Sequence, residues 1–171
     1  MDMKLETKRL IIRAFNLQDA SFILELFNTK SWLKNIGDRG VHSLEDAEQY
    51  LKNRIIASYQ EHGFGMYAMT EKTSQTTIGM CGIVKRAGLE QPDFGFALLP
   101  EYMRKGYTYE AAKGILAYAT EHLTIKQLYA ITLPQNTASN ELLKKLNFVY
   151  QKDIKLPNDG EILYLYNLSL V

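Results

Sequence analysis

The chain has 171 residues, a formal net charge of +1 and 46% hydrophobic residues. These values are typical of a folded globular protein, and we expect a single domain over residues 1–171. They lack the basic excess of nucleic-acid-binding modules, and no apolar run is long enough to span a bilayer. With its one cysteine, Cys81, the chain forms no internal disulfide. We therefore expect a cytoplasmic protein that binds neither nucleic acid directly nor a membrane.

The N-terminal third predicts a strand followed by two helices. Residues 9–15 are short, β-branched and apolar, as strands are. Asn16 then caps a helix, and Ser43 with Asp46 forms the capping box of a second helix that Gly63 ends. Residues 31–40 lie between these two predicted helices.

Residues 31–40 (SWLKNIGDRG) are polar and are predicted to form a loop. The loop contains the tryptophan of the chain, Trp32. Trp32 either anchors this loop on the core or forms a wall of an acceptor pocket, and the sequence leaves both readings open.

Strand patterns dominate the middle of the chain. Residues 64–70, 76–85 and 93–99 are three strand-like runs that suggest an antiparallel meander. Cys81 lies in the apolar second run, where a buried small hydrophobe is favoured over a nucleophile.

The C-terminal part alternates helices with strands. Helical spacing of apolar residues covers 107–122 and 136–146, and strand patterns cover 127–133, 148–154 and 161–170. A strand, a helix and a strand in sequence imply at least one parallel pair within a mixed sheet.

The segment LLPEYMRKGYTYEAAKGIL, residues 98–116, has the pattern of an anion site. A strand ends there, and a helix begins at Gly106 beside Arg104 and Lys105. The first N–H groups of a helix have no partners within the helix and attract anions, and glycine lets an anion approach the backbone. An ordinary strand–turn–helix connection gives the same pattern, and neither the Walker loop nor the dinucleotide fingerprint is present.

A second segment, together with the first, resembles the motifs of a known family. PQNTASNELLKKLNF, residues 134–148, resembles the N-x-x-S-x-x-x-L-x-K-x-G-F block of GCN5-related N-acetyltransferases (GNAT), with Asn147 in place of the usual glycine. The turn at 103–108 resembles that family's pyrophosphate loop. TKRLIIRAFNLQDA, IGMCGI and the run from Pro100 to Ala111 resemble the ribosomal-protein N-terminal (RimJ/RimL-like) acetyltransferases. The resemblance covers nearly the whole chain in the right order.

The resemblance implies a fold and a cofactor. The fold is a mixed, mostly antiparallel α/β sheet of about seven strands, with one splayed parallel pair and helices on both faces. The cofactor is acetyl-CoA, used as a co-substrate, with its pantetheine arm along the strand that ends at residue 99. The implied cofactor-binding residues are Ala97, Leu98, Leu99, Met103, Arg104, Lys105, Gly106, Tyr107, Thr108, Asn136 and Ser139.

The resemblance also suggests two catalytic residues. Asp93 matches an acidic residue that acts as a base in many relatives, although an exposed acid at the strand edge has the same position. Ser139 is a candidate proton donor to the leaving thiolate, although a first-turn hydroxyl that bonds the helix backbone has the same position. Leu143 stands where many relatives have a tyrosine acid. No spacing of histidine, cysteine and carboxylates suggests a metal site.

These features predict an N-acetyltransferase that acts on a protein N-terminal α-amine or a small amine by direct attack in a ternary complex. The alternative is a non-catalytic acyl-CoA sensor, because the family's tyrosine is missing. The chain is expected to be a monomer or a homodimer.

Overall fold

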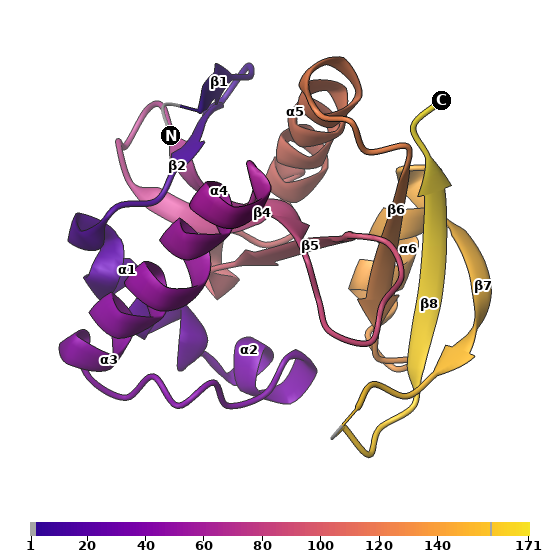
Figure 1. Ribbon diagram of the computed structural model, residues 1–171. Helices are drawn as coiled ribbons and strands as arrows, with labels where there is room; N and C mark the ends of the chain where they lie inside the picture. The colour runs from indigo at the N-terminus through magenta and orange to yellow at the C-terminus, as the bar shows by residue number, and fades with distance from the viewer. Residues whose placement is uncertain (1–2, 158) are drawn as a thin grey trace.

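The computed structural model describes residues 3–157 and 159–171. It contains an eight-stranded sheet in the order β1-β2-β3-β4-β5-β6-β8-β7 (Figure 1). The strands are β1 Lys4–Glu6, β2 Leu10–Ala14, β3 Met66–Glu71, β4 Thr77–Val84, β5 Asp93–Leu98, β6 Gln127–Thr132, β7 Val149–Ile154 and β8 Leu163–Ser169. Neighbouring strands are antiparallel except β5 and β6, which are parallel. This confirms the predicted mixed sheet with one parallel pair.

The sheet has one strand more than the seven predicted. The additional strand, β1, has three residues and pairs with β2 from Lys4↔Arg13 to Glu6↔Ile11. Three residues are too few to show the alternation by which a strand is recognised.

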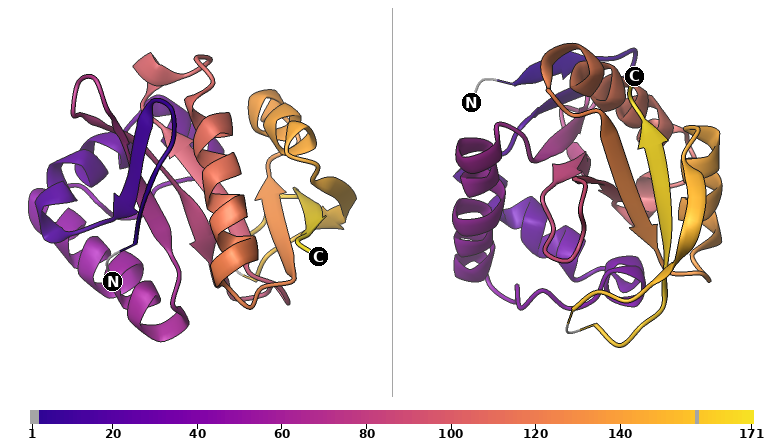
Figure 2. Two further views of the ribbon diagram at one scale, coloured as in Figure 1. Left: turned by 90° about the horizontal axis from the view of Figure 1, so that it is seen from above. Right: turned by 45° about the vertical axis from the view of Figure 1, so that its right-hand side comes forward.

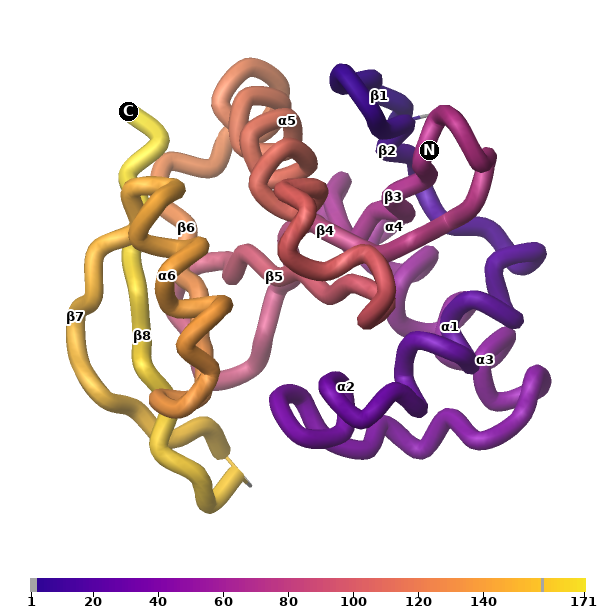
Figure 3. The backbone as a smooth tube through the Cα atoms, turned by 180° about the vertical axis from the view of Figure 1, so that it is seen from behind, coloured from indigo at the N-terminus to yellow at the C-terminus, as the bar shows by residue number. Residues whose placement is uncertain are grey.

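The helices cover both faces of the sheet. They are α1 Ala20–Phe27, α2 Lys30–Asn35, α3 Leu44–Tyr50, α4 Ala57–His62, α5 Tyr107–His122 and α6 Thr137–Lys145, with short 3-10 turns at Leu17–Asp19 and Pro100–Tyr102. Helices α1, α3 and α4 lie on one side, and α5 and α6 lie on the other (Figures 1 and 3). The sheet is therefore the middle layer of three.

Helix ends follow the predicted signals. Asn16 caps the Leu17–Asp19 turn through a capping box, and Gly63 ends α4 in the left-handed conformation with φ 76°. Asn147 has φ 67°, and Phe148 N donates to Leu143 O at 3.0 Å after α6. This 6→1 bond is that of a Schellman motif, so asparagine replaces glycine here without changing the helix exit.

The predicted loop at residues 31–40 is partly wrong, because its first half is helix α2. Thr29 caps α2 by accepting a bond from Trp32 N at 3.3 Å. Gly37, with φ 105°, follows the end of this helix. A threonine cap and a glycine stop were thus present in the sequence, but the polar residues between them hid a helix of less than two turns.

Helices α3 and α4 are joined without a break by a π-helical segment, Leu51–Ile56. Its backbone bonds span one residue more than those of an α-helix, and such segments are rare and are frequently found at functional sites. One long helix therefore runs from Leu44 to His62 beside the sheet.

The parallel pair β5–β6 is open over most of its length. The two strands share the pairing Asp93↔Tyr129, supported by a bond from Tyr129 N to Pro92 O at 2.9 Å, and then diverge. Strand β6 instead pairs along its whole length with β8. Figure 2 shows β6, β8, β7 and α6 grouped at one end of the sheet. The divergence opens a gap within the sheet itself.

Candidate active site

A cleft of about 1470 Å³ is associated with this divergence. Its walls come from β5, β6, the start of α5, α6, helix α2 and the long helix 44–62. The cleft therefore brings together polar and apolar residues from segments that are far apart in the sequence.

The backbone of β5 is partly unpaired along the cleft. Leu99 N donates to Ile78 O at 2.8 Å, so the N–H groups of odd-numbered β5 residues point toward β4. Because strand groups alternate, the N–H and C=O groups of Phe94, Phe96 and Leu98 point the other way, toward the diverging β6. A free strand edge of this kind binds an extended chain through its backbone.

The alternation gives the backbone direction of the three residues expected to bind pantetheine. Leu98 has its N–H and C=O groups on the open side of β5. The N–H of Leu99 donates to Ile78 O, and the backbone of Ala97 is directed at Met80 of β4. Phe96, which was not among the three, also has its backbone groups on the open side, and both Phe96 and Ala97 line the cleft.

The turn before α5 has the backbone geometry of an anion site. Arg104 and Gly106 have positive φ, 60° and 81°, on either side of Lys105. Within the described part of the chain, the backbone N–H groups of residues 104–109 donate to no protein acceptor. Successive free N–H groups at a turn and a helix N-terminus form an anion-binding concavity. Of the predicted loop residues, Met103, Arg104, Gly106, Tyr107 and Thr108 line the cleft.

The β1–β2 turn supports this loop, which the sequence analysis did not predict. Arg9 Nη1 donates to Lys105 O at 2.8 Å, and Arg9 Nε donates to Glu110 at 2.7 Å. The Arg9 guanidinium also stacks over the Tyr107 ring at 4.3 Å, and the Tyr107 hydroxyl donates to Glu71. Arg9 lies about one hundred residues before Lys105, Tyr107 and Glu110 in the sequence, and the motifs did not predict these contacts.

Asp93 is buried at the point where β5 and β6 separate. Its exposed fraction is 1%, which excludes an exposed edge acid, and Arg86 Nε lies 3.2 Å from one of its oxygens. Burial raises the pKa of the Asp93 carboxyl, and the charge and hydrogen bond of Arg86 lower it only in part. A carboxylate whose pKa is raised toward neutrality has the property required of a general base.

Ser139 and Asn136 occupy the first turn of α6 on the opposite wall of the cleft. Asn136 Oδ1 accepts a bond from Ser139 N at 3.2 Å, so Asn136 is the N-cap of α6. Among the described residues the Ser139 hydroxyl has no hydrogen-bond partner. The reading in which this hydroxyl bonds the helix backbone is therefore not what the structure shows.

A buried polar network fixes this wall. Asn140 Oδ1 accepts bonds from the Thr132 hydroxyl and, at 2.8 Å, from the Tyr166 hydroxyl. Asn140 Nδ2 lies 3.2 Å from both Leu133 O and Pro134 O. Asn140 thus joins β6, β8 and α6. The sequence motifs did not identify it as a site residue.

The comparisons with known proteins match this geometry. The family model for the acetyltransferase (GNAT) domain matches residues 9–149. The chain belongs to the GNAT acetyltransferase family. It is 28% identical over 145 residues to the N-acetyltransferase YoaA of Bacillus subtilis, covering 84% of this chain and 81% of that protein.

Solved structures share the GNAT fold over nearly the whole chain. A ribosomal-protein-alanine acetyltransferase of Vibrio fischeri superposes with a TM-score of 0.82 at 20% identity, covering 98% of this chain and 97% of that one. The ribosomal-protein α-N-acetyltransferase RimL, in complex with coenzyme A, superposes with a TM-score of 0.83 at 16% identity, covering 98% of both chains. Membership of the GNAT family, expected from the motifs, is confirmed, and these two structures share its fold.

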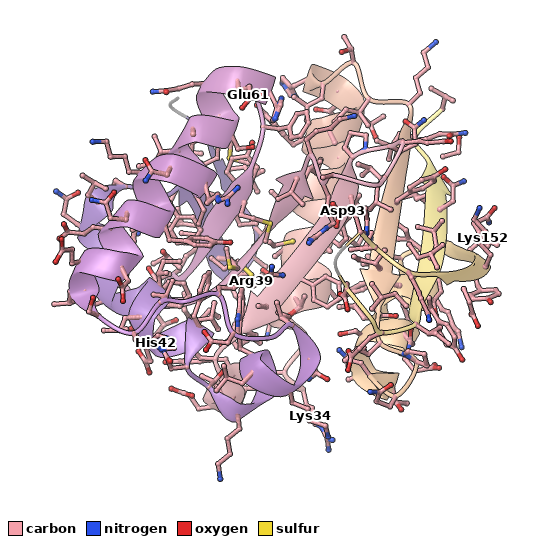
Figure 4. All side chains as sticks on the ribbon, turned by 60° about the horizontal axis from the view of Figure 1, so that its bottom comes forward. Lys34, Arg39, His42, Glu61, Asp93 and Lys152 are labelled. Carbon is pink, nitrogen blue, oxygen red and sulfur yellow. The ribbon has the colours of Figure 1, made fainter. Side chains whose placement is uncertain are left out.

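The remaining part of the cleft of this GNAT enzyme lies on the α2 and α4 side. Trp32 anchors helix α2 on the core, where its ring stacks on Phe27 with centroids 3.9 Å apart, and it also lines the cleft. In Figure 4, Asp93 and Arg39 lie at the central opening, whereas Lys34 and Lys152 point outward. The long helix adds a polar stripe to this wall: Asn53, Arg54, Ser58 and Glu61.

Cys81 does not line the cleft of this GNAT chain in the described part of the structure. Cys81 is fully buried, and burial raises the pKa of its thiol, as expected for a packed small side chain. Across residues 3–157 and 159–171, no three histidine, cysteine or carboxylate side chains are grouped as a metal site. No helix in the same ranges has the length and hydropathy to cross a membrane.

Proposed function

We propose that this acetyltransferase transfers an acetyl group from acetyl-CoA to a primary amine. The observation that carries the proposal is the free edge of β5, which connects the unpaired N–H groups at Gly106 with the buried Asp93. The loop would hold the diphosphate of the cofactor, and the backbone of Phe96 and Leu98 would hold the pantetheine arm. The thioester would then lie between the Leu98 N–H and Ser139, and Asp93 would lie farther along β5.

Each residue of the cleft has a distinct task in this proposal. Asp93, at the opposite end of β5 from Leu98, accepts through water the proton that the amine loses as its nitrogen attacks the thioester carbonyl. The Leu98 N–H stabilises the oxyanion that forms there, because a fixed donor in a closed cleft is most effective at developing charge. As the carbon–sulfur bond breaks, the Ser139 hydroxyl protonates the thiolate, and water restores the proton to Ser139.

The acceptor is proposed to be an α-amine, such as a protein N-terminus, or a small amine of similar basicity. With a pKa near 7.7–8.0, roughly one α-amine in seven is neutral at pH 7, whereas a lysine amine is neutral about once in 2,500. One buried carboxylate suffices for the first and is a weak base for the second. The names of RimL and of the Vibrio fischeri enzyme, which refer to ribosomal proteins, support a peptide acceptor.

A thiol-release assay tests the function. The protein is incubated with acetyl-CoA and matched pairs of peptides, one with a free N-terminus and no lysine, the other with a blocked N-terminus and one lysine. We expect coenzyme A to be released with the first peptides and much more slowly with the second. Binding of acetyl-CoA without release for any amine would instead support the non-catalytic sensor.

A further inference from the structure

We infer that Arg9 is a positioning residue that orients the Gly106 N–H toward the cofactor's diphosphate. The inference rests on the proposed function and adds a role for a residue outside the cleft walls. Arg9 lies in the turn between β1 and β2, almost a hundred residues before the loop in the sequence. Its side chain contacts the loop at the Lys105 carbonyl.

The argument starts from one peptide unit. The Lys105 carbonyl and the Gly106 N–H belong to the same planar trans peptide, so they point in opposite directions. Arg9 Nη1 donates to that carbonyl at 2.8 Å. Holding the carbonyl toward the β1–β2 turn therefore turns the Gly106 N–H away from it, and Gly106 itself lines the cleft.

This peptide requires an external restraint. Glycine populates both signs of φ readily, so the Lys105–Gly106 peptide can rotate at little energetic cost. In the described residues, Gly106 N–H has no protein acceptor that would hold it in place. A Cβ at Gly106 would meet Arg9 Nη2 at 3.3 Å, which shows how closely the guanidinium approaches the turn.

Arg9 is itself rigidly held. Glu110 accepts bonds from Arg9 Nε and Arg9 N, each at 2.7 Å, and from Thr7 Oγ1 at 2.6 Å. The Cζ atom of its guanidinium lies over the Tyr107 ring, 4.3 Å from the centroid. A fixed donor fork of this kind positions its acceptor, whereas a flexible ammonium supplies only charge. The side chains of Arg104 and Lys105 form no ion pair with a carboxylate in the described structure, so they lack a restraint of this kind.

The test compares two ligands on the same variants. Coenzyme A contains the diphosphate, and pantetheine lacks it. We expect Arg9→Ala to raise the Kd of coenzyme A about tenfold and to change that of pantetheine less than twofold. Arg9→Lys should behave like Arg9→Ala, because an ammonium on a flexible stem lacks the planar fork whose Nε and Nη1 bond Glu110 and the Lys105 carbonyl in a fixed geometry. Lys8→Ala removes an exposed neighbouring charge and is the matched control.

A direct readout is the Gly106 amide resonance. Inorganic pyrophosphate should shift it in the wild-type protein and in Lys8→Ala, and should shift it little in Arg9→Ala. Equal losses of affinity for coenzyme A and pantetheine, or full affinity for coenzyme A in Arg9→Lys, would overturn the inference. A wild-type protein that binds no coenzyme A would instead overturn the proposed function.

Discussion

Asp93 shows how one side chain obtains its chemistry from its position. Asp93 is the first residue of β5 and pairs there with Tyr129 of β6. Its burial at this point raises the pKa of its carboxyl. Arg86 opposes that rise through its charge and its bond to the carboxylate. Reactivity is therefore set by the balance between desolvation and one guanidinium.

The balance predicts a pH profile. A base is active when deprotonated, so kcat/KM should fall as the pH drops through the raised pKa of Asp93. Arg86→Gln removes the group that lowers this pKa and should move the acid limb to higher pH. Asp93→Asn should lower kcat about 10–100-fold, at or below the usual gain from general base catalysis. An acid limb that stays in place in Arg86→Gln would assign the titration to another group.

Ser139 gives a second prediction at this scale. Its hydroxyl bonds no protein group among the described residues, so Ser139→Ala should leave the melting temperature unchanged. A thiol is already a good leaving group, so we expect kcat to fall by only about 10–100-fold, toward the lower end of acid catalysis. Asn136→Ala is the contrasting variant, because loss of the cap should cost about 1 kcal/mol of stability. Full turnover in Ser139→Ala would leave water as the acid.

At the scale of elements, helix ends place the functional groups. Helix α5 begins at Gly106 and presents its free N–H groups to the cleft, and α6 begins at Asn136 and presents Ser139. The far end of α6 is fixed by Asn147 in the left-handed region, which returns the chain into β7. Both walls of the cleft therefore depend on how two helices start and stop.

Asn147 allows this dependence to be measured. Left-handed geometry costs most residues roughly 1–2 kcal/mol, asparagine less and glycine almost nothing. Asn147→Ala should lower the free energy of unfolding by about 1 kcal/mol, and Asn147→Gly should leave it unchanged or raise it. Urea unfolding of the three proteins measures the order. A variant with alanine as stable as the one with glycine would show that this exit conformation is not maintained in solution.

At the scale of the whole molecule, local signals predicted most elements and few of the contacts between them. The limits of α5, the Asn16 cap and the Gly63 stop depend on neighbouring residues and were correct. Strand β1 was missed because its stability comes from pairing with β2, and α2 because it is short and polar.

The candidate site divides in the same way. The loop at Gly106 and the residues of α6 were marked by their motifs. The motifs did not predict the roles of Asn140 and Arg86 or the pairing of Arg9 with Glu110. These roles depend on partners that the fold brings together. The assignment of β5 backbone groups also required the pairing register, which decides whether Leu98 or Leu99 faces the cleft.

Binding of the cofactor is expected to stabilise the whole molecule. A ligand at one hundred times its Kd adds about 2.7 kcal/mol to the stability of the state that binds it. For a protein of this size that corresponds to a rise in melting temperature of roughly 5–11 °C. A thermal melt with and without acetyl-CoA measures the shift. Pantetheine at the same concentration is the control, and a shift of equal size with both ligands would contradict a diphosphate contribution.

The π-helical segment Leu51–Ile56 determines the direction in which each later side chain of the long helix points. An α-helix advances by about 100° for each residue. Deleting one residue of the segment would restore regular α-helix and rotate residues 57–62 by about that angle. Ser58 and Glu61 would then leave the cleft wall, and Tyr59 would leave the core, where it is now buried. A single additional residue in one turn thus decides which side chains of the long helix line the cleft.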